Sequence, residues 1–318
     1  MANEYSIPST YDTFVLTTSL ADYQKRLVDN AYNKSVILKM LNGGETKRMI
    51  DGGNSIVETI IKEKQSEGGF YLGADVLNNT QKNTTTMVEF KWQNCYEPIQ
   101  ITRDEERQNS GVAHKIIDLV GTKIKLSEKA IAERLDRALS TPVSEANNLN
   151  DLETLVNTGT LGTIAGGTDT FWQSTVTISG SFATQGLSDM TTAYYAVASA
   201  QSDETPDIFI TTKTVFQKFE QTRLPLERIS NGNMSANAGF DNLTFKGKPL
   251  TYGNNISSGL LFGLNRNYLY LAVDSETDMI TTPFITPTNQ TVKVAYILWR
   301  GQLITNNRRR HFKLTSIS

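Results

Sequence analysis

Residues that could do acid–base or metal chemistry are few in this chain. Its histidines are His114 and His311, and its single cysteine is Cys95. A catalytic triad needs a base beside a nucleophile, and neither histidine is accompanied by the Gly-x-Ser-x-Gly motif that presents a serine. Zinc sites use closely spaced pairs of Cys and His ligands, and this sequence has none. We therefore predict no catalytic residue, no metal and no cofactor.

Two other stretches have compositions that occur in active sites. Residues 159–167 are rich in glycine, but their spacing matches neither a phosphate-binding loop nor the dinucleotide fingerprint, so we predict an ordinary loop. Asp104, Glu105 and Glu106 could include a general acid–base pair. Because Arg103 and Arg107 flank them, a salt-bridged junction is the better interpretation.

The strongest basic cluster is Arg308, Arg309 and Arg310, followed by His311. These arginines could pair with the carboxylates of a neighbouring subunit, since arginine is enriched at protein interfaces. They could instead contact DNA phosphates, or form a plain polar turn between two strands. The three interpretations stay open at this stage.

Composition sets the class of protein. The 318 residues suffice for one or two domains with a buried core, and 38% are hydrophobic. The formal net charge of -2 argues against a dedicated nucleic-acid binder, although a shell around DNA needs no basic excess. One cysteine excludes an intrachain disulfide and suits a reducing cytoplasm. We expect no signal peptide and no contact with a membrane.

The elements that must position these residues begin with an arm and a hairpin. Residues 1–50 are predicted as an arm with a helix from Leu20 to Met40, and residues 51–103 as a long hairpin with a polar, glycine-containing tip. On its return strand Val88, Phe90 and Trp92 share one face. A two-stranded ribbon cannot bury such a face alone. We therefore predict that a neighbouring subunit covers these three residues.

The rest of the chain reads as helices and strands around a core. An amphipathic pattern predicts a long helix over residues 110–140. Residues 150–282 are predicted as a mixed α/β domain with helices at 187–200 and 212–221 and a surface loop at 230–242. Residues 283–318 are predicted as closing strands at 292–299 and 314–317.

Short motifs in this order resemble the major capsid proteins of tailed phages, which have the Hong Kong 97-like fold. The motifs are Gly166-Gly167-Thr168-Asp169 followed by Phe171-Trp172, Phe245 to Leu250, Phe262 to Asn265, and Trp299 to Leu303. The resemblance implies an α+β fold with an N-terminal arm, an extended β-hairpin loop, a peripheral domain with a spine helix, and an axial α/β domain. The implied boundaries are 1–50 for the arm, 51–103 for the loop, 104–149 for the peripheral domain, 150–282 for the axial domain, and 283–318 for strands that return to the peripheral domain.

The resemblance also implies a function. It predicts a non-enzymatic shell protein that forms hexamers and pentamers of itself and encloses the double-stranded DNA of a tailed phage, which it touches non-specifically. The expected partners are a portal and a separate scaffolding protein, and the expected location is the virion after assembly in the host bacterial cytoplasm. Val88, Phe90, Trp92, Arg308, Arg309 and Arg310 are the candidate inter-subunit contacts. The alternatives are an encapsulin-type compartment shell and, more distantly, an enzyme with an unrecognised site.

Overall fold

A computed structural model describes residues 36–43, 46–78, 80–108, 119–143, 147–198, 204–230, 243–288 and 290–318. The chain divides into two compact units, and the following paragraphs take each by itself. The smaller unit includes residues 96–131 and 279–298, and the larger one residues 34–95, 132–278 and 299–318. Helix α4 (Leu119–Ser140) and strand β14 (Val292–Thr305) each run from one unit into the other.

The smaller unit contains most of β4 (Gln93–Thr102), α3 (Arg103–Gln108), β13 (Ile280–Thr281) and the first parts of α4 and β14. Strand β4 pairs with β14, and Ile280 of β13 lies opposite Leu298 in an antiparallel ladder. The acidic run is the first turn of α3, where negative charge is favourable. Lys123 Nζ lies 2.8 Å from Glu105 Oε2, and Lys293 Nζ lies 2.7 Å from Glu106 Oε1. The predicted salt-bridged junction is confirmed.

The larger unit contains a six-stranded sheet with the order β7-β15-β11-β8-β10-β9. Its strands are β7 (Thr175–Ile178), β15 (Phe312–Thr315), β11 (Leu261–Leu264), β8 (Ile208–Thr211), β10 (Lys248–Tyr252) and β9 (Leu243–Phe245). Helices α6 (Leu187–Val197) and α7 (Lys213–Ser230) carry buried residues of the same apolar core, among them Met190 and Phe219. The predicted mixed α/β character of this region and its two helices are confirmed, with shifted helix ends.

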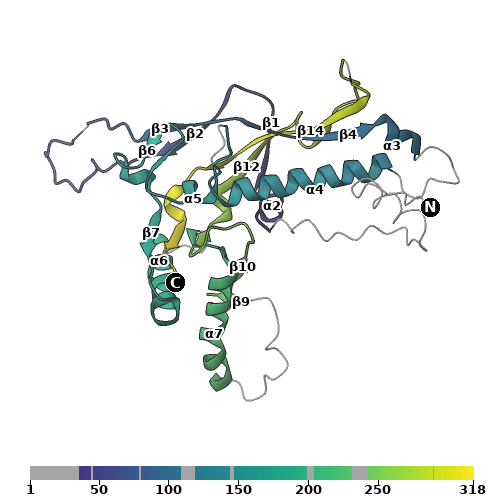
Figure 1. The fold of residues 1–318 in the computed structure, drawn as a ribbon. Coiled ribbons are helices and arrows are strands. Elements are labelled where there is room, and N and C mark those ends of the chain that lie inside the picture. Colours follow the sequence, from purple (N-terminus) through teal and green to yellow (C-terminus); the bar gives the residue numbers. More distant parts are fainter. Residues whose placement is uncertain are drawn as a thin grey trace, which may run out of the picture. The chain divides into compact units, whose positions relative to one another are not determined.

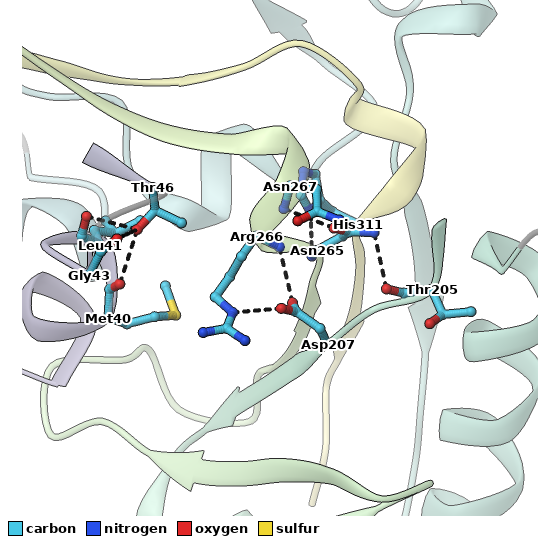
Figure 2. Close-up of polar contacts among 10 residues, drawn as sticks. All are labelled: Met40, Leu41, Gly43, Thr46, Thr205, Asp207, Asn265, Arg266, Asn267 and His311. Atoms are coloured by element: carbon cyan, nitrogen blue, oxygen red, sulfur yellow. Dashed lines mark hydrogen bonds and ion pairs between the residues drawn. The ribbon is translucent and has the colours of Figure 1, made fainter. Parts of the chain in front are cut away.

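A second set of strands in the larger unit joins β1 (Lys47–Ile50), β12 (Leu269–Asp274) and the end of β14. Strand β1 runs parallel to β12, and β12 runs antiparallel to β14. The short helix α2 (Val36–Leu41) precedes β1, and Asp136 of α4 accepts hydrogen bonds from the backbone of Ile37 and Leu38, each 3.1 Å long. After it, the Thr46 hydroxyl donates toward the carbonyls of Met40, Leu41 and Gly43, as Figure 2 shows.

The predicted hairpin forms in the larger unit from β2 (Ser55–Ile61) and β3 (Thr85–Lys91), which pair antiparallel from Ser55↔Lys91 to Ile61↔Thr85. In Figure 1 the connection between them runs well past the strand ends. The predicted return strand, however, is two strands. After Trp92 the chain continues as β4, which pairs with β14 instead of with β2.

The closing strands also differ from the prediction. Strand β15 does not accompany β14, because it lies inside the six-stranded sheet between β7 and β11. Conversely, β12 was predicted within the α/β domain but pairs with β1 and β14.

Three predictions concern residues outside the described ones. They are the arm with most of its helix (1–35), the first part of the long helix with His114 (109–118), and the loop at 231–242. Where it is described, the long helix agrees with its pattern, since Ile131 and Leu135 are buried on one side of α4.

Candidate inter-subunit surfaces

The apolar face of the hairpin is covered by the chain itself. Val88 is 0% exposed and Phe90 1% exposed, together with Ile56 and Ile60 of β2. The cover is a small hairpin made of β5 (Thr160–Leu161) and β6 (Ile164–Ala165). The prediction that a neighbour must cover Val88 and Phe90 is therefore wrong.

The turn of this small hairpin lies directly on β3. Thr163 Oγ1 accepts a hydrogen bond of 3.2 Å from the backbone N–H of Glu89. Gly162 has a φ of +63°, and a Cβ added there would lie 2.6 Å from Val88 Cγ2 and 2.7 Å from the Glu89 carbonyl oxygen. Glycine is required here by both backbone conformation and space. The glycine-rich stretch predicted as a plain loop is thus a covering element.

Trp92 is half-buried just after β3, and Arg300 of the same chain lies over its ring. The guanidinium carbon of Arg300 lies 5.0 Å from the centre of its ring, within the range of a cation–π contact. No acceptor for its indole N–H is found among the described residues. Trp92 therefore packs within its own subunit, and its proposed role as a contact to a neighbour is untested.

The exposed apolar residues lie instead in the connection between β2 and β3. Phe70 is 109% exposed, Val76 98%, Leu72 85%, Tyr71 66% and Leu77 61%. We call these five residues the apolar tip. The outer face of the ribbon adds exposed Val57, Ile61 and Met87. The sequence prediction described this connection as polar, although Phe70-Tyr71-Leu72 and Val76-Leu77 were the signal for an apolar surface.

Arg308 is fully buried in the 3₁₀ turn η5 (Arg308–Arg310), which leads into β15. It donates hydrogen bonds to the carbonyl oxygens of Leu155 (2.6 Å), Gly159 (2.6 Å), Thr154 (2.7 Å) and Trp172 (3.1 Å). Burial lowers the pKa of Arg308 to about 10, which leaves it charged at neutral pH.

These bonds give Arg308 a structural role. Two of the carbonyls belong to the C-terminal end of α5 (Leu152–Leu155), where a cation is favourable. The other two belong to the chain on either side of the β5–β6 hairpin. Arg308 cannot reach a neighbouring subunit, so its prediction as an inter-subunit contact is wrong.

The next two arginines have different surroundings. Arg310 is half-buried, donates 2.9 Å to the carbonyl oxygen of Val197, and forms an ion pair with Glu204. Arg309 is exposed, and no hydrogen bond or ion pair of its side chain is found among the described residues. Of the three, Arg309 alone retains a free guanidinium for a carboxylate or a phosphate outside the subunit.

His311 is a buried structural residue. Its Nδ1 accepts a hydrogen bond of 3.2 Å from the Asn265 backbone N–H, and its Nε2 lies 3.3 Å from Thr305 Oγ1 (Figure 2 shows His311 beside Asn265). The Thr305 hydroxyl donates its proton to the Tyr268 carbonyl oxygen, so we assign the imidazole proton to Nε2. Burial lowers the pKa of His311 to about 3. A neutral imidazole with both nitrogens occupied is no general base.

Other polar groups near Asn265 are also paired within the chain. The Asn265 amide donates 3.0 Å to the Thr205 carbonyl oxygen, and its Oδ1 accepts from the Asn267 N–H at 3.0 Å (Figure 2). Arg266 binds Asp207 through both its side chain and its backbone. These contacts hold the connection from β11 to β12 in place, and they pair the polar groups named here within the chain.

The described residues contain no group of three or more His, Cys, Asp and Glu side chains that could hold a metal ion. No described helix is long and apolar enough to cross a membrane.

Solved structures match the fold of this chain over nearly its whole length. A capsid subunit of cyanophage A-1(L) has a TM-score of 0.65 at 14% identity, covering 93% of this chain and 97% of that one. The capsid of Myoviridae phage XM1 has a TM-score of 0.60 at 12% identity, covering 94% and 97%. The chain has the fold of tailed-phage major capsid proteins.

The same fold also occurs in an encapsulin. The SrpI encapsulin of Synechococcus elongatus PCC 7942 has a TM-score of 0.60 at 9% identity, covering 98% of this chain and 97% of that one. No family model and no curated protein matches the sequence. The fold is therefore established by structure alone.

Proposed function

We propose that this chain is the major capsid protein of a tailed phage, assembling into hexamers and pentamers that close into an icosahedral head around double-stranded DNA. The observation that carries the proposal is the structural match with phage capsid subunits over nearly the full length of both chains. We further propose a portal and a separate scaffolding protein as partners, the virion as its location, and assembly in the host bacterial cytoplasm.

The exposed connection of the hairpin supports assembly. Five large apolar side chains gather within eight positions, from Phe70 to Leu77, on a segment that the subunit leaves in water. Burying a side chain of this size contributes roughly 1.5–3 kcal/mol. A contact of that strength, repeated around a closed shell, favours association strongly.

The proposed domain roles follow the same logic. Residues 51–103 contribute the extended loop, α4 the spine of a peripheral domain, and the six-stranded sheet the core of an axial domain. Because β12 and the end of β14 pair with β1, we place them with the peripheral domain. Strand β15 goes with the axial sheet.

The polar groups support a structural rather than enzymatic role. Among the described residues that could have served as acid or base, His311 is bound to Asn265 and Thr305, and Glu105 to Lys123, within the fold.

The experiment that tests the proposal replaces residues 63–83 with Asn-Gly. Lys62 N–H donates 2.9 Å to the Thr84 carbonyl oxygen, so a two-residue turn can close the ribbon directly. We expect a folded subunit by circular dichroism that forms no shells in sedimentation and electron microscopy. The matched control changes Gln65 and Gln81, exposed polar residues of the same connection, to serine and should assemble normally.

Two outcomes count against the proposal. If the shortened protein forms normal shells, the connection is not an assembly contact. If the full-length chain stays monomeric with its scaffold present, the proposed capsid function is wrong.

The encapsulin alternative rests on the similarity to SrpI. The contents of native particles distinguish the encapsulin function from the phage capsid function. Nuclease-protected DNA of genome length indicates a phage head, whereas a protein cargo without DNA indicates a compartment.

A further inference from the structure

The connection between β2 and β3 is not a simple open loop, because polar side chains join its two arms. Lys82 Nζ lies 2.5 Å from Glu67 Oε1 and 3.2 Å from Ser66 Oγ. The Asn78 amide donates to Glu67 Oε2. We call Ser66, Glu67, Asn78 and Lys82 the clasp.

Beyond the clasp, a turn folds the apolar tip back on itself. Asp75 Oδ2 accepts 2.9 Å from the Leu72 N–H, and the Asp75 N–H donates 3.3 Å to the Leu72 carbonyl oxygen. Gly73 within this turn has a φ of +56°. Phe70 to Leu72 therefore lie on one side of the turn, and Val76 and Leu77 on the other.

The clasp lies between the ribbon and the apolar tip. The clasp joins the two ends of the segment 68–81, so that this part of the connection is a shorter closed loop. A shorter closed loop loses less conformational entropy when it becomes ordered. The opposite charges at Glu67 and Lys82 also lower the pKa of Glu67 and raise that of Lys82, each mainly through the hydrogen bond between them.

We propose that the clasp is a positioning device for assembly: it holds the apolar tip in the shape in which a second copy of this chain receives it. This inference rests on the proposed function. The tip suits an apolar recess rather than DNA, because its one charged residue between Gly68 and Leu77 is Asp75, an acid engaged in the turn. The chain also exposes apolar side chains elsewhere, such as Ile280 and Ile285, that another copy could present to the tip.

The expected effect is modest for each contact. An exposed ion pair changes an equilibrium by about 1.5- to 5-fold. Docking a flexible segment requires ordering it, so a segment that is already ordered associates more readily. Loss of the clasp should therefore raise the subunit concentration at which shells form by about 1.5- to 5-fold.

The test is a charge exchange. Glu67→Lys and Lys82→Glu are made singly and together, and the assembly threshold of the full chain is measured by sedimentation. Each single variant should raise the threshold, and the double variant should restore it, because the reversed pair can form the same bond. Lys64→Glu, at an exposed lysine of the same connection, is the control for charge alone and should leave the threshold unchanged.

The outcomes separate this inference from the proposed function. If both single variants assemble like wild type while Phe70→Asp prevents shells, the tip docks without help from the clasp and the inference is wrong. A double variant that stays as defective as the single ones also overturns it, since Glu67 and Lys82 would then act separately. If Phe70→Asp assembles normally as well, the tip is not an assembly contact, and that part of the proposed function fails too.

Discussion

Replacing Arg308 with methionine should destabilise the larger unit, and the neighbouring arginines supply the controls. Methionine fills a similar volume but donates no hydrogen bond, so the carbonyl oxygens of Thr154, Leu155, Gly159 and Trp172 lose their shared donor. Arg309→Met removes an equal charge from an exposed side chain one residue away.

The size of the effect follows from the surroundings of Arg308. Hydrogen bonds from a charged donor contribute roughly 1.5–3 kcal/mol each. The cost of burying the charge opposes this stabilisation by the hydrogen bonds. Burial lowers the pKa of Arg308 to about 10, and this shift corresponds to about 3 kcal/mol at roughly 1.36 kcal/mol per pKa unit. Four bonds exceed this cost, and we expect Arg308→Met to lose about 3 kcal/mol or more of unfolding free energy.

Urea denaturation of the unassembled subunit, followed by tryptophan fluorescence, measures this loss of unfolding free energy in the larger unit. All three tryptophans, Trp92, Trp172 and Trp299, lie in the larger unit, and the Trp172 carbonyl is one of the four acceptors. Arg309→Met should stay within about 0.5 kcal/mol of wild type. A loss below about 1 kcal/mol for Arg308→Met, or one equal to that of Arg309→Met, would refute the reasoning.

Three further predictions concern other residues. Because the pKa of His311 is lowered from 6.5 to about 3, the unfolded chain binds the extra proton between these pH values, and stability should fall as pH drops from 6.5 to 3; His311→Gln should lack this part of the pH dependence in urea titrations. Gly162→Ala should cost more than about 2 kcal/mol in the same assay, since its Cβ would meet Val88 and the Glu89 carbonyl. Arg309→Glu should leave the fold intact and weaken either shell formation, if it faces a neighbour's carboxylate, or DNA packaging, if it faces phosphate; normal shells filled with DNA would show that Arg309 does neither.

Local patterns predicted the elements whose own sequence carries a period. The buried residues of α4 recur at helical spacing, and β3 alternates between buried Val88 and Phe90 and exposed Glu89 and Lys91. Periodicity identifies which face is apolar. It contains no information about what covers that face, because the covering residues 160–165 lie some 70 positions further along the chain.

Strand β15 shows why the closing strands were misplaced. Lys313 stands between Phe312 and Leu314, which gives the alternation of a half-exposed strand. In the structure all three are buried, and Lys313 donates 3.0 Å to the Glu153 carbonyl oxygen. Burial lowers the pKa of Lys313, while Glu153 and Asp151 oppose that shift. A buried lysine depends on partners that are distant in sequence, so the β-type composition of 314–317 did not indicate which sheet this strand joins.

The three arginines differ in their surroundings for a geometric reason. Three consecutive residues of a 3₁₀ turn point in directions about 120° apart, so one of them can face the core while the next faces water. Arg308 is buried, Arg309 exposed and Arg310 half-buried. A cluster of like residues therefore does not make one surface, and only Arg309 remains as a candidate contact.

Together these contacts separate the folding of the subunit from its assembly. Arg308 holds the chain on both sides of the β5–β6 hairpin, and that hairpin covers Val88 and Phe90 at the root of the ribbon. The root therefore has its apolar face buried before any neighbour arrives. The apolar tip has no such cover within the described chain. Changes at the root should thus appear first as lost stability, and changes at the tip as lost association in a subunit that still folds, because the root residues are buried within the subunit and the tip residues are exposed.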